Sequence, residues 1–140
     1  MDEPVYWYAV ATVLLFVKMW ATGLYQGFHR ITKKTFKTPE DARMAGTEPA
    51  QEELPQVQQA SKAWSNDLEN IPIFLGLGVA YVLVGASSGL AVWLFMIFTA
   101  ARYCHTLCYL AKLQPWRTVS YGVGLLCMIV MSIQIVLALS

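Results

Sequence analysis

Charged residues are scarce in this sequence. Asp, Glu, Lys and Arg make up 14% of its 140 residues, whereas 56% are hydrophobic and the mean hydropathy is +0.46. A soluble domain carries roughly a quarter charged residues. Lipid, as a second apolar solvent, is the simplest explanation of the deficit. The composition therefore predicts one domain, embedded in a membrane.

Cysteine and clustered positive charge are also in short supply. The three cysteines, Cys104, Cys108 and Cys127, fall in apolar stretches, and an odd count there argues against a disulfide framework. Cys104, His105 and Cys108 form an incomplete ligand set, so we expect no metal and interpret the cysteines as small packing residues. The only basic cluster, residues 30–37, is followed directly by acidic residues, so we expect no nucleic-acid partner.

Apolar runs predict an all-α integral membrane protein, a bundle of four transmembrane helices. A spanning helix needs about 20 apolar residues. The runs place helices at about 4–29, 57–84, 89–111 and 117–139, with a polar loop at about 30–56. The second run is too short to cross alone and must recruit polar residues upstream, and the third must continue through Arg102 and His105.

Charges at the helix ends predict the orientation. The sequence begins with the acidic residues Asp2 and Glu3, whereas a cleavable signal peptide begins with basic residues. We therefore expect no cleavable signal peptide. Asp2 and Glu3 would lie at one membrane face and the basic residues at the other, which the positive-inside rule places in the cytosol. The basic residues are Arg30, Lys33, Lys34, Lys37, Lys112 and Arg117. We therefore expect a multi-pass protein of the endoplasmic reticulum in a eukaryote, or of the inner membrane in a bacterium.

Three polar stripes lie within the last three predicted helices, toward their cytosolic ends. Ionisable groups inside a span normally face the bundle interior or a wet cavity. Residues three and four positions apart share a helix face, so the stripes can converge on one pocket. Their members are Lys62, Asn66 and Glu69, then Arg102, His105 and Tyr109, then Arg117 and Tyr121 with Thr118 adjacent.

Each of these residues also has a simpler interpretation. Lys62 can extend to the lipid head groups, and Arg117 can anchor a helix at the interface. Glu69 and Arg102 can form a structural ion pair between helices, while His105 can cap a backbone carbonyl. Three stripes at one depth nevertheless favour a binding site.

The stripes offer cations, one carboxylate, an amide, an imidazole and hydroxyls. This set suits a small zwitterion with two carboxylates and an amine. It contains no Gly-rich phosphate loop and no arrangement typical of hydrolases. Lys18, deep in the first span, is expected to reach the interface or to pair with another helix, and we assign it no chemistry.

Several segments resemble the MAPEG family of membrane-associated proteins in eicosanoid and glutathione metabolism. The strongest is Asn66-Asp67-Leu68-Glu69-Asn70-Ile71 followed by Pro72, which is similar to the signature of the family's glutathione transferases. Two further segments support it, Thr38-Pro39-Glu40-Asp41-Ala42 and Arg102-Tyr103-Cys104-His105-Thr106 through Tyr109-Leu110. Two others, Val17-Lys18-Met19 and Arg117-Thr118-Val119-Ser120-Tyr121, are similar to the prostaglandin E synthase branch of the family, and the resemblance covers nearly the whole chain.

This resemblance implies a homotrimer that binds glutathione between neighbouring subunits near the cytosolic face. Glu69 would receive the amino group of glutathione, Arg30 and His105 would hold its carboxylates, and Arg102 would brace Glu69 or Tyr109. Arg117 would sit beside the sulfur and favour its thiolate, with Thr118 and Tyr121 adding hydrogen bonds. The binding residues are expected to be Arg30, Lys62, Asn66, Glu69, Arg102, His105, Tyr109, Arg117 and Tyr121.

The expected function is a glutathione transferase, with peroxidase activity as a further possibility, acting on lipophilic electrophiles that enter from the membrane between the first and fourth helices. Two alternatives remain open. One is a prostaglandin E synthase-type isomerase, although that branch carries arginines at the positions of Lys62 and Ser65 and a serine at that of Thr118. The other is a non-catalytic lipid-binding protein.

Overall fold

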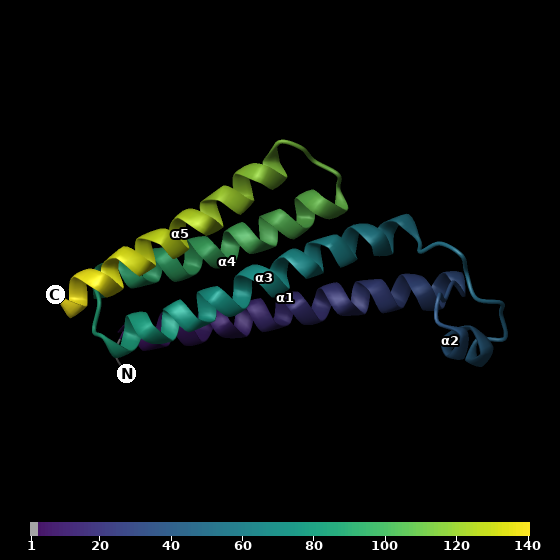
Figure 1. Ribbon diagram of the computed structural model, residues 1–140, viewed down its shortest axis with the longest axis horizontal. Helices are drawn as coiled ribbons and strands as arrows, with labels where there is room; N and C mark the ends of the chain where they lie inside the picture. Colours follow the sequence, from purple (N-terminus) through teal and green to yellow (C-terminus); the bar gives the residue numbers. More distant parts are fainter. Residues whose placement is uncertain (1–2) are drawn as a thin grey trace.

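Four long helices lie side by side along most of the chain (Figure 1). The computed structural model describes residues 3–140, and in this range it contains helices and no strand. The helices are α1 (Glu3–Lys33), α2 (Pro39–Met44), α3 (Pro55–Leu83), α4 (Ser88–Leu110) and α5 (Trp116–Leu139). The start of α1 and the C-terminus lie at one end of the molecule, and α2 lies at the other. Asp2, part of the orientation argument, lies outside the described residues.

The polar connection after α1 contains a short helix that the sequence analysis took for loop. Pro39 stands in the first turn of α2 with Glu40 and Asp41, and Arg43 stands in the last turn. Proline fits the first turn of a helix because its missing N–H is not needed there, and acidic residues favour the helix N-terminus. The sequence from Thr38 to Asp41 is therefore typical of the start of a helix.

Three of the long helices end in the same type of backbone turn. Lys34, Gly85 and Lys112 follow α1, α3 and α4 with φ of 49°, 66° and 56°. After each, the next backbone N–H returns to a carbonyl five residues earlier, as in the bond from Ala86 to Tyr81. This Schellman geometry satisfies carbonyls that the helix leaves free. After Gly85 and Lys112 a short connection leads directly into the next long helix, whereas after Lys34 the chain passes through α2 before α3 begins.

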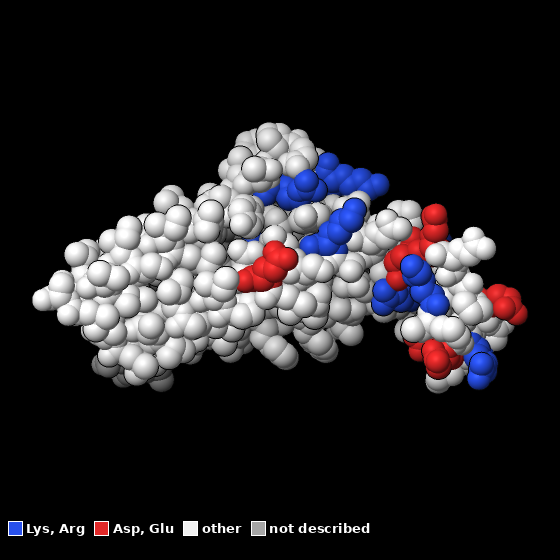
Figure 2. Space-filling model, viewed as in Figure 1, with Lys and Arg blue, Asp and Glu red and all other residues white. Residues whose placement is uncertain are grey.

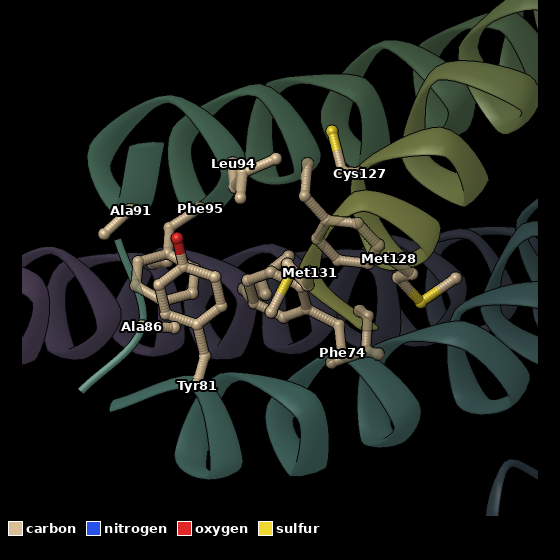
Figure 3. Packing of buried hydrophobic residues seen from close by; sticks show 13 residues of the cluster. Phe74, Tyr81, Ala86, Ala91, Leu94, Phe95, Cys127, Met128 and Met131 are labelled. Atoms are coloured by element: carbon tan, nitrogen blue, oxygen red, sulfur yellow. The ribbon is translucent and has the colours of Figure 1, made fainter. Parts of the chain in front are cut away.

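The core is built from aromatic side chains of α3 and α4 (Figure 3). The rings of Phe74 and Phe98 stack with centroids 3.9 Å apart, and Phe95 meets the edge of Phe74 and of Tyr81. Helix α1 contributes Ala11 and Leu15, and α5 contributes Cys127, Met128 and Met131. Of the three cysteines, only Cys127 is buried, and Cys104 is exposed, so interpreting Cys104 as a packing residue was wrong.

A glycine lets α1 approach α3 closely. A Cβ added at Gly78 would lie 2.4 Å from the ring of Tyr8. That ring is held in place, because the Tyr8 hydroxyl donates to the carbonyl of Leu75 at 3.1 Å and the ring meets Phe95 edge-on. Gly78 is therefore required by packing.

Three helices, α1, α4 and α5, are long and apolar enough to cross a membrane. Large apolar side chains on the outside of α1 and α5, such as Phe16, Trp20, Leu126 and Ile133, are exposed. On the face shown in Figure 2 the charged side chains gather in the half of the molecule nearer α2, and the other half is uncharged. An outer surface of this kind suits contact with lipid.

Candidate functional site

Six side chains from three helices line one polar pocket near the end of the bundle that α2 occupies. Its volume is about 230 Å³. Helix α3 contributes one residue, α4 two and α5 three: Asn66, His105, Tyr109, Arg117, Thr118 and Tyr121. The structure thus brings together one member of the first expected stripe, two of the second and all of the third.

Arg117 is the cation that faces this pocket. Its guanidinium carbon lies 4.6 Å from the ring centroid of Tyr109, a cation–π arrangement. The imidazole of His105 meets the edge of the Tyr109 ring at 5.0 Å between centroids and lies 6.3 Å from that of Tyr121. Within residues 3–140 Arg117 forms no salt bridge, so its positive charge is available to a ligand.

Thr118 and Tyr121 flank Arg117 on α5. The Thr118 hydroxyl donates to the side-chain oxygen of Gln114 at 3.2 Å, and both residues are exposed. Thr118 and Tyr121 both line the pocket with Arg117, and Tyr121, four positions after Arg117, shares its helix face.

A buried ion cluster lies directly behind the pocket. The carboxylate of Asp67 is fully buried and accepts hydrogen bonds from Lys18 of α1 and from Arg102 of α4. Arg102 uses two nitrogens, Nε at 3.0 Å and Nη2 at 2.7 Å, and is only 1% exposed. Three helices therefore meet at one carboxylate. The cluster carries two positive charges against one negative.

Arg102 was expected to brace Glu69 or Tyr109, and the pairing with Glu69 was wrong. The carboxylate that binds Arg102 is that of Asp67, and Glu69 is exposed on the outer side of α3. Asp67 follows Asn66 directly and is therefore not part of the stripe of Lys62, Asn66 and Glu69, so the helical spacing gave no reason to predict a contact for it. Charge matching alone would have left two candidates, since Lys18 is the only charged residue of the first predicted span, whereas the second contains both Asp67 and Glu69. The prediction that Lys18 pairs with another helix is confirmed.

Arg102 also connects the cluster to the pocket. Its Nη2 donates to Oδ1 of Asn66 at 2.7 Å and lies 3.4 Å from Nδ1 of His105. Arg102 itself does not line the pocket. It lies behind Asn66 and His105, which do line the pocket.

Three of the expected binding residues lie away from this pocket within one chain. Arg30, at the end of α1, donates to the carboxylate of Glu53 at 2.5 Å and 3.0 Å and lines a separate hollow with Thr38 and Asp41. Lys62 and Glu69 are exposed on α3. In the part of the chain that the structure describes, no group of three His, Cys, Asp or Glu side chains could hold a metal ion.

Comparison with known proteins identifies the family. The sequence model that describes the MAPEG family matches residues 6–137. The chain belongs to the MAPEG family. This MAPEG chain is an integral membrane protein, as its three apolar helices and its membership of a membrane family indicate.

Two kinds of MAPEG relative have similar sequences. The chain is 38% identical over 130 residues to microsomal glutathione S-transferase 1 of Homo sapiens, with 89% of this chain and 84% of the relative covered. It is 35% identical over 129 residues to prostaglandin E synthase of Homo sapiens, with 91% and 85% covered. Microsomal glutathione S-transferase 1 of Sus scrofa is 39% identical over 119 residues, with 81% and 76% covered.

Proposed function

We propose that this chain is a glutathione transferase that activates the glutathione thiol for attack on lipophilic electrophiles dissolved in the membrane. The observation that carries the proposal is the position of Arg117. Its guanidinium has no acidic partner within the described residues and faces a pocket lined by an amide, an imidazole and hydroxyl groups. The 38% identity to a microsomal glutathione S-transferase supports the same conclusion.

The chemistry of thiols explains why a fixed positive charge matters. A free thiol has a pKa of about 8.5, so only a few per cent is thiolate at neutral pH. A guanidinium cannot lose its proton and therefore acts as a permanent cation that favours the thiolate. Each unit by which the thiol pKa falls requires about 1.4 kcal/mol of preference for the charged form. One close cation in a partly dry pocket can supply that preference.

In the proposed reaction the thiolate attacks an electrophilic carbon and forms a carbon–sulfur bond. The displaced group leaves with the bonding electrons, or, when the attack is on an activated double bond, water protonates the resulting carbanion. Thr118 and Tyr121 would donate hydrogen bonds to the sulfur or to the second substrate. In the proposed peroxidase reaction the thiolate attacks the terminal oxygen of a lipid hydroperoxide and breaks the O–O bond, so that glutathione becomes a sulfenic acid and the alkoxide leaves and takes a proton from water. A second glutathione then reacts with the sulfenic acid to give the disulfide and water.

The site is completed, in our proposal, by neighbouring subunits of a homotrimer. Glu69 and Lys62 are exposed on α3, a helix that packs against α1, α4 and α5. A carboxylate exposed to lipid is costly, so this polar face needs another protein surface. A trimer would bury it, and α3 would then serve as the fourth transmembrane helix. Glu69 would bind the amino group of glutathione, Arg30 and His105 would hold its carboxylates, and Lys62 would be a further binding residue.

The second substrate would come from the bilayer. Within the described chain α1 and α5 do not contact each other, so an approach between these two helices requires α1 of one subunit and α5 of another. Following the positive-inside rule, we place the pocket at the cytosolic face. In a eukaryotic cell the membrane would be that of the endoplasmic reticulum.

A second candidate is a glutathione-dependent isomerase. The 35% identity to prostaglandin E synthase favours it. An isomerase would use glutathione as a cofactor and would not consume it. A non-catalytic lipid-binding protein is less well supported, since it would not need an unpaired cation in a polar pocket.

Titration of the detergent-purified protein with glutathione at neutral pH tests the proposal. A saturable ultraviolet thiolate signal is expected, together with loss of that signal in Arg117→Leu. Glutathione consumption with a hydrophobic electrophile then separates a transferase from an isomerase. Absence of glutathione binding to the wild-type protein would refute the catalytic proposal and leave the lipid-binding alternative.

A further inference from the structure

Asp67 and Arg102 lie behind the pocket and contact no substrate in the proposed reaction. Arg102 contacts two side chains that line the pocket, Asn66 and His105, and Asp67 binds Arg102. We propose that Asp67 is a positioning residue, which holds Arg102 so that Asn66 and His105 both present N–H groups to the pocket. The predicted effect on glutathione binding rests on the proposed function. The predicted orientation of Asn66 and tautomer of His105 concern the protein without glutathione.

The first step concerns the amide of Asn66. A guanidinium has only hydrogen-bond donors. The Asn66 side-chain atom that lies 2.7 Å from Arg102 Nη2 must therefore be the oxygen, Oδ1. The remaining amide group of Asn66, which lines the pocket, is the NH₂ group. Arg102 thus fixes which end of the amide a ligand meets.

The second step concerns the tautomer of His105. Nδ1 of His105 lies 3.4 Å from the same guanidinium nitrogen. A proton on Nδ1 would point toward a donor and a permanent positive charge, whereas an unshared electron pair there is favourable. The neutral ring with its proton on Nε2 is therefore the stable form. Because Nδ1 is turned toward Arg102, the ring presents Nε2–H on its other side.

The third step concerns what holds Arg102. Nε and Nη2 both donate to Oδ1 of Asp67, and Lys18 occupies the other carboxylate oxygen. Asp67 is 0% exposed and Arg102 1% exposed, so water does not compete for these bonds. Charge-assisted bonds in such surroundings are among the strongest in proteins. The guanidinium has no freedom to turn away from Asn66 and His105.

The consequence is a pocket floor made of N–H donors with a net positive cluster behind them. Such a floor binds acceptor groups, and the carboxylates and peptide carbonyls of glutathione are acceptors. Neither Asn66 nor Arg102 contacts Arg117, whose guanidinium stacks on Tyr109. Glutathione affinity and thiolate formation should therefore respond to different substitutions.

The test uses a double variant, Lys18→Met with Asp67→Leu. Removing Lys18 and Asp67 together leaves one buried cation, Arg102, without a carboxylate, whereas removing Asp67 alone would leave two, so the double variant is the better tolerated of the two. The variant also keeps the net charge of the cluster at +1, because Arg102 remains. Lys18→Met alone is the matched control, since it leaves the bonds between Asp67 and Arg102 in place. Glu48→Gln, an exposed carboxylate in the connection before α3, controls for loss of negative charge.

The first readout is nitrogen NMR of ¹⁵N-histidine-labelled protein without glutathione. His29 is the only other histidine, and a His29→Gln variant assigns the signals. We expect an unprotonated Nδ1 and a protonated Nε2 for His105 in the wild type and in Lys18→Met, and a mixture of tautomers in the double variant. A wild-type ring protonated on Nδ1, or an unchanged ring in the double variant, would overturn the proposal.

The second readout is glutathione titration of the same proteins. Loss of hydrogen bonds to a charged ligand weakens binding about tenfold or more. We expect the double variant to bind glutathione about tenfold more weakly while its thiolate signal at saturation is retained, because Arg117 is unchanged. A purely structural role would reduce the amount of active protein and leave the affinity of the remainder at the wild-type value, which would refute positioning.

The two proposals fail in different ways. If the wild type binds no glutathione, the proposed function is wrong, while the NMR result still decides the tautomer. If the wild type binds glutathione and the double variant binds it equally well, the function stands and the positioning role is wrong.

Discussion

The guanidinium of Arg117 lies over the ring of Tyr109, 4.6 Å from its centroid. This contact holds a cation at the pocket by stacking, with no carboxylate to neutralise it within the described residues. A stacked guanidinium keeps its full charge for a ligand, whereas a salt-bridged one shares it. The charge of Arg117 should therefore change the pH at which a bound thiol ionises.

The thiol of bound glutathione should ionise at lower pH in the wild type than in Arg117→Leu. The cation stabilises the deprotonated form, so its removal raises the thiol pKa and shifts the thiolate transition to higher pH by about one unit or more. Ultraviolet absorbance recorded from pH 6 to 10 with saturating glutathione measures the shift. Arg117→Lys keeps a charge but loses the planar stacking, so an intermediate curve is expected. Identical curves for wild type and Arg117→Leu would exclude the thiolate mechanism.

Glu69→Gln should weaken glutathione binding and leave the fold intact. Glu69 is exposed within one chain, so its substitution disturbs no described contact. Loss of a charged partner for the amino group predicts binding about 10- to 100-fold weaker. Isothermal titration measures this, and Glu48→Gln serves as the control for a distant exposed carboxylate. Unchanged affinity in Glu69→Gln would contradict the proposed position of the amino group.

Gly78→Ala should destabilise the protein, although alanine is the better helix former. The new methyl group would lie 2.4 Å from the ring of Tyr8, which a hydrogen bond to Leu75 holds in place. Overpacking of this kind costs about 1–3 kcal/mol. Gly76→Ala, two positions away and with no atom within 4 Å, should be neutral or slightly stabilising. Thermal unfolding of both variants in the same detergent checks the difference, and equal midpoints would show that Tyr8 moves freely.

Phe98→Ala should destabilise the bundle, whereas Trp93→Ala on the same helix should not. Phe98 is fully buried and stacks on Phe74, and Trp93 is 64% exposed. In water-soluble cores such truncations cost about 3–5 kcal/mol, partly from transfer out of water. Since helices separated in a membrane remain in an apolar solvent, only the packing part is lost here, about 1–3 kcal/mol. Comparison of unfolding midpoints in one detergent separates the two variants.

Much of the fold followed from the apolar runs, because a spanning helix requires a long stretch of suitable residues. The four long helices occupy nearly the ranges that those runs indicate. Helix α2 was missed because six residues are too few to show a hydrophobic period. Its only signal was the sequence from Thr38 to Asp41, which is typical of a helix start.

The pocket was easier to anticipate than the cluster behind it. His105 and Tyr109 are one turn apart on one helix, and Arg117 and Tyr121 on another, so local spacing indicates a shared face. The partners of Asp67 are 35 and 49 positions away in sequence, at Arg102 and Lys18. Spacing along a single helix contains no information about such contacts. Only the relative rotation of packed helices decides whether Asp67 or Glu69 reaches Arg102.

The pairing of Lys18 with Asp67 also constrains the order of events during synthesis. Helix α1 is made first and carries an ammonium group in its middle, while the carboxylate that binds it is 49 residues further along the chain. At about 5–20 residues per second, several seconds separate the two. An unpaired charge at the centre of a helix costs about 3 kcal/mol on insertion scales. In the proposed arrangement with α3 as a fourth span, α1 would become fully stable in the bilayer only once α3 has followed it, and these two helices would form the earliest lasting unit of the nascent protein.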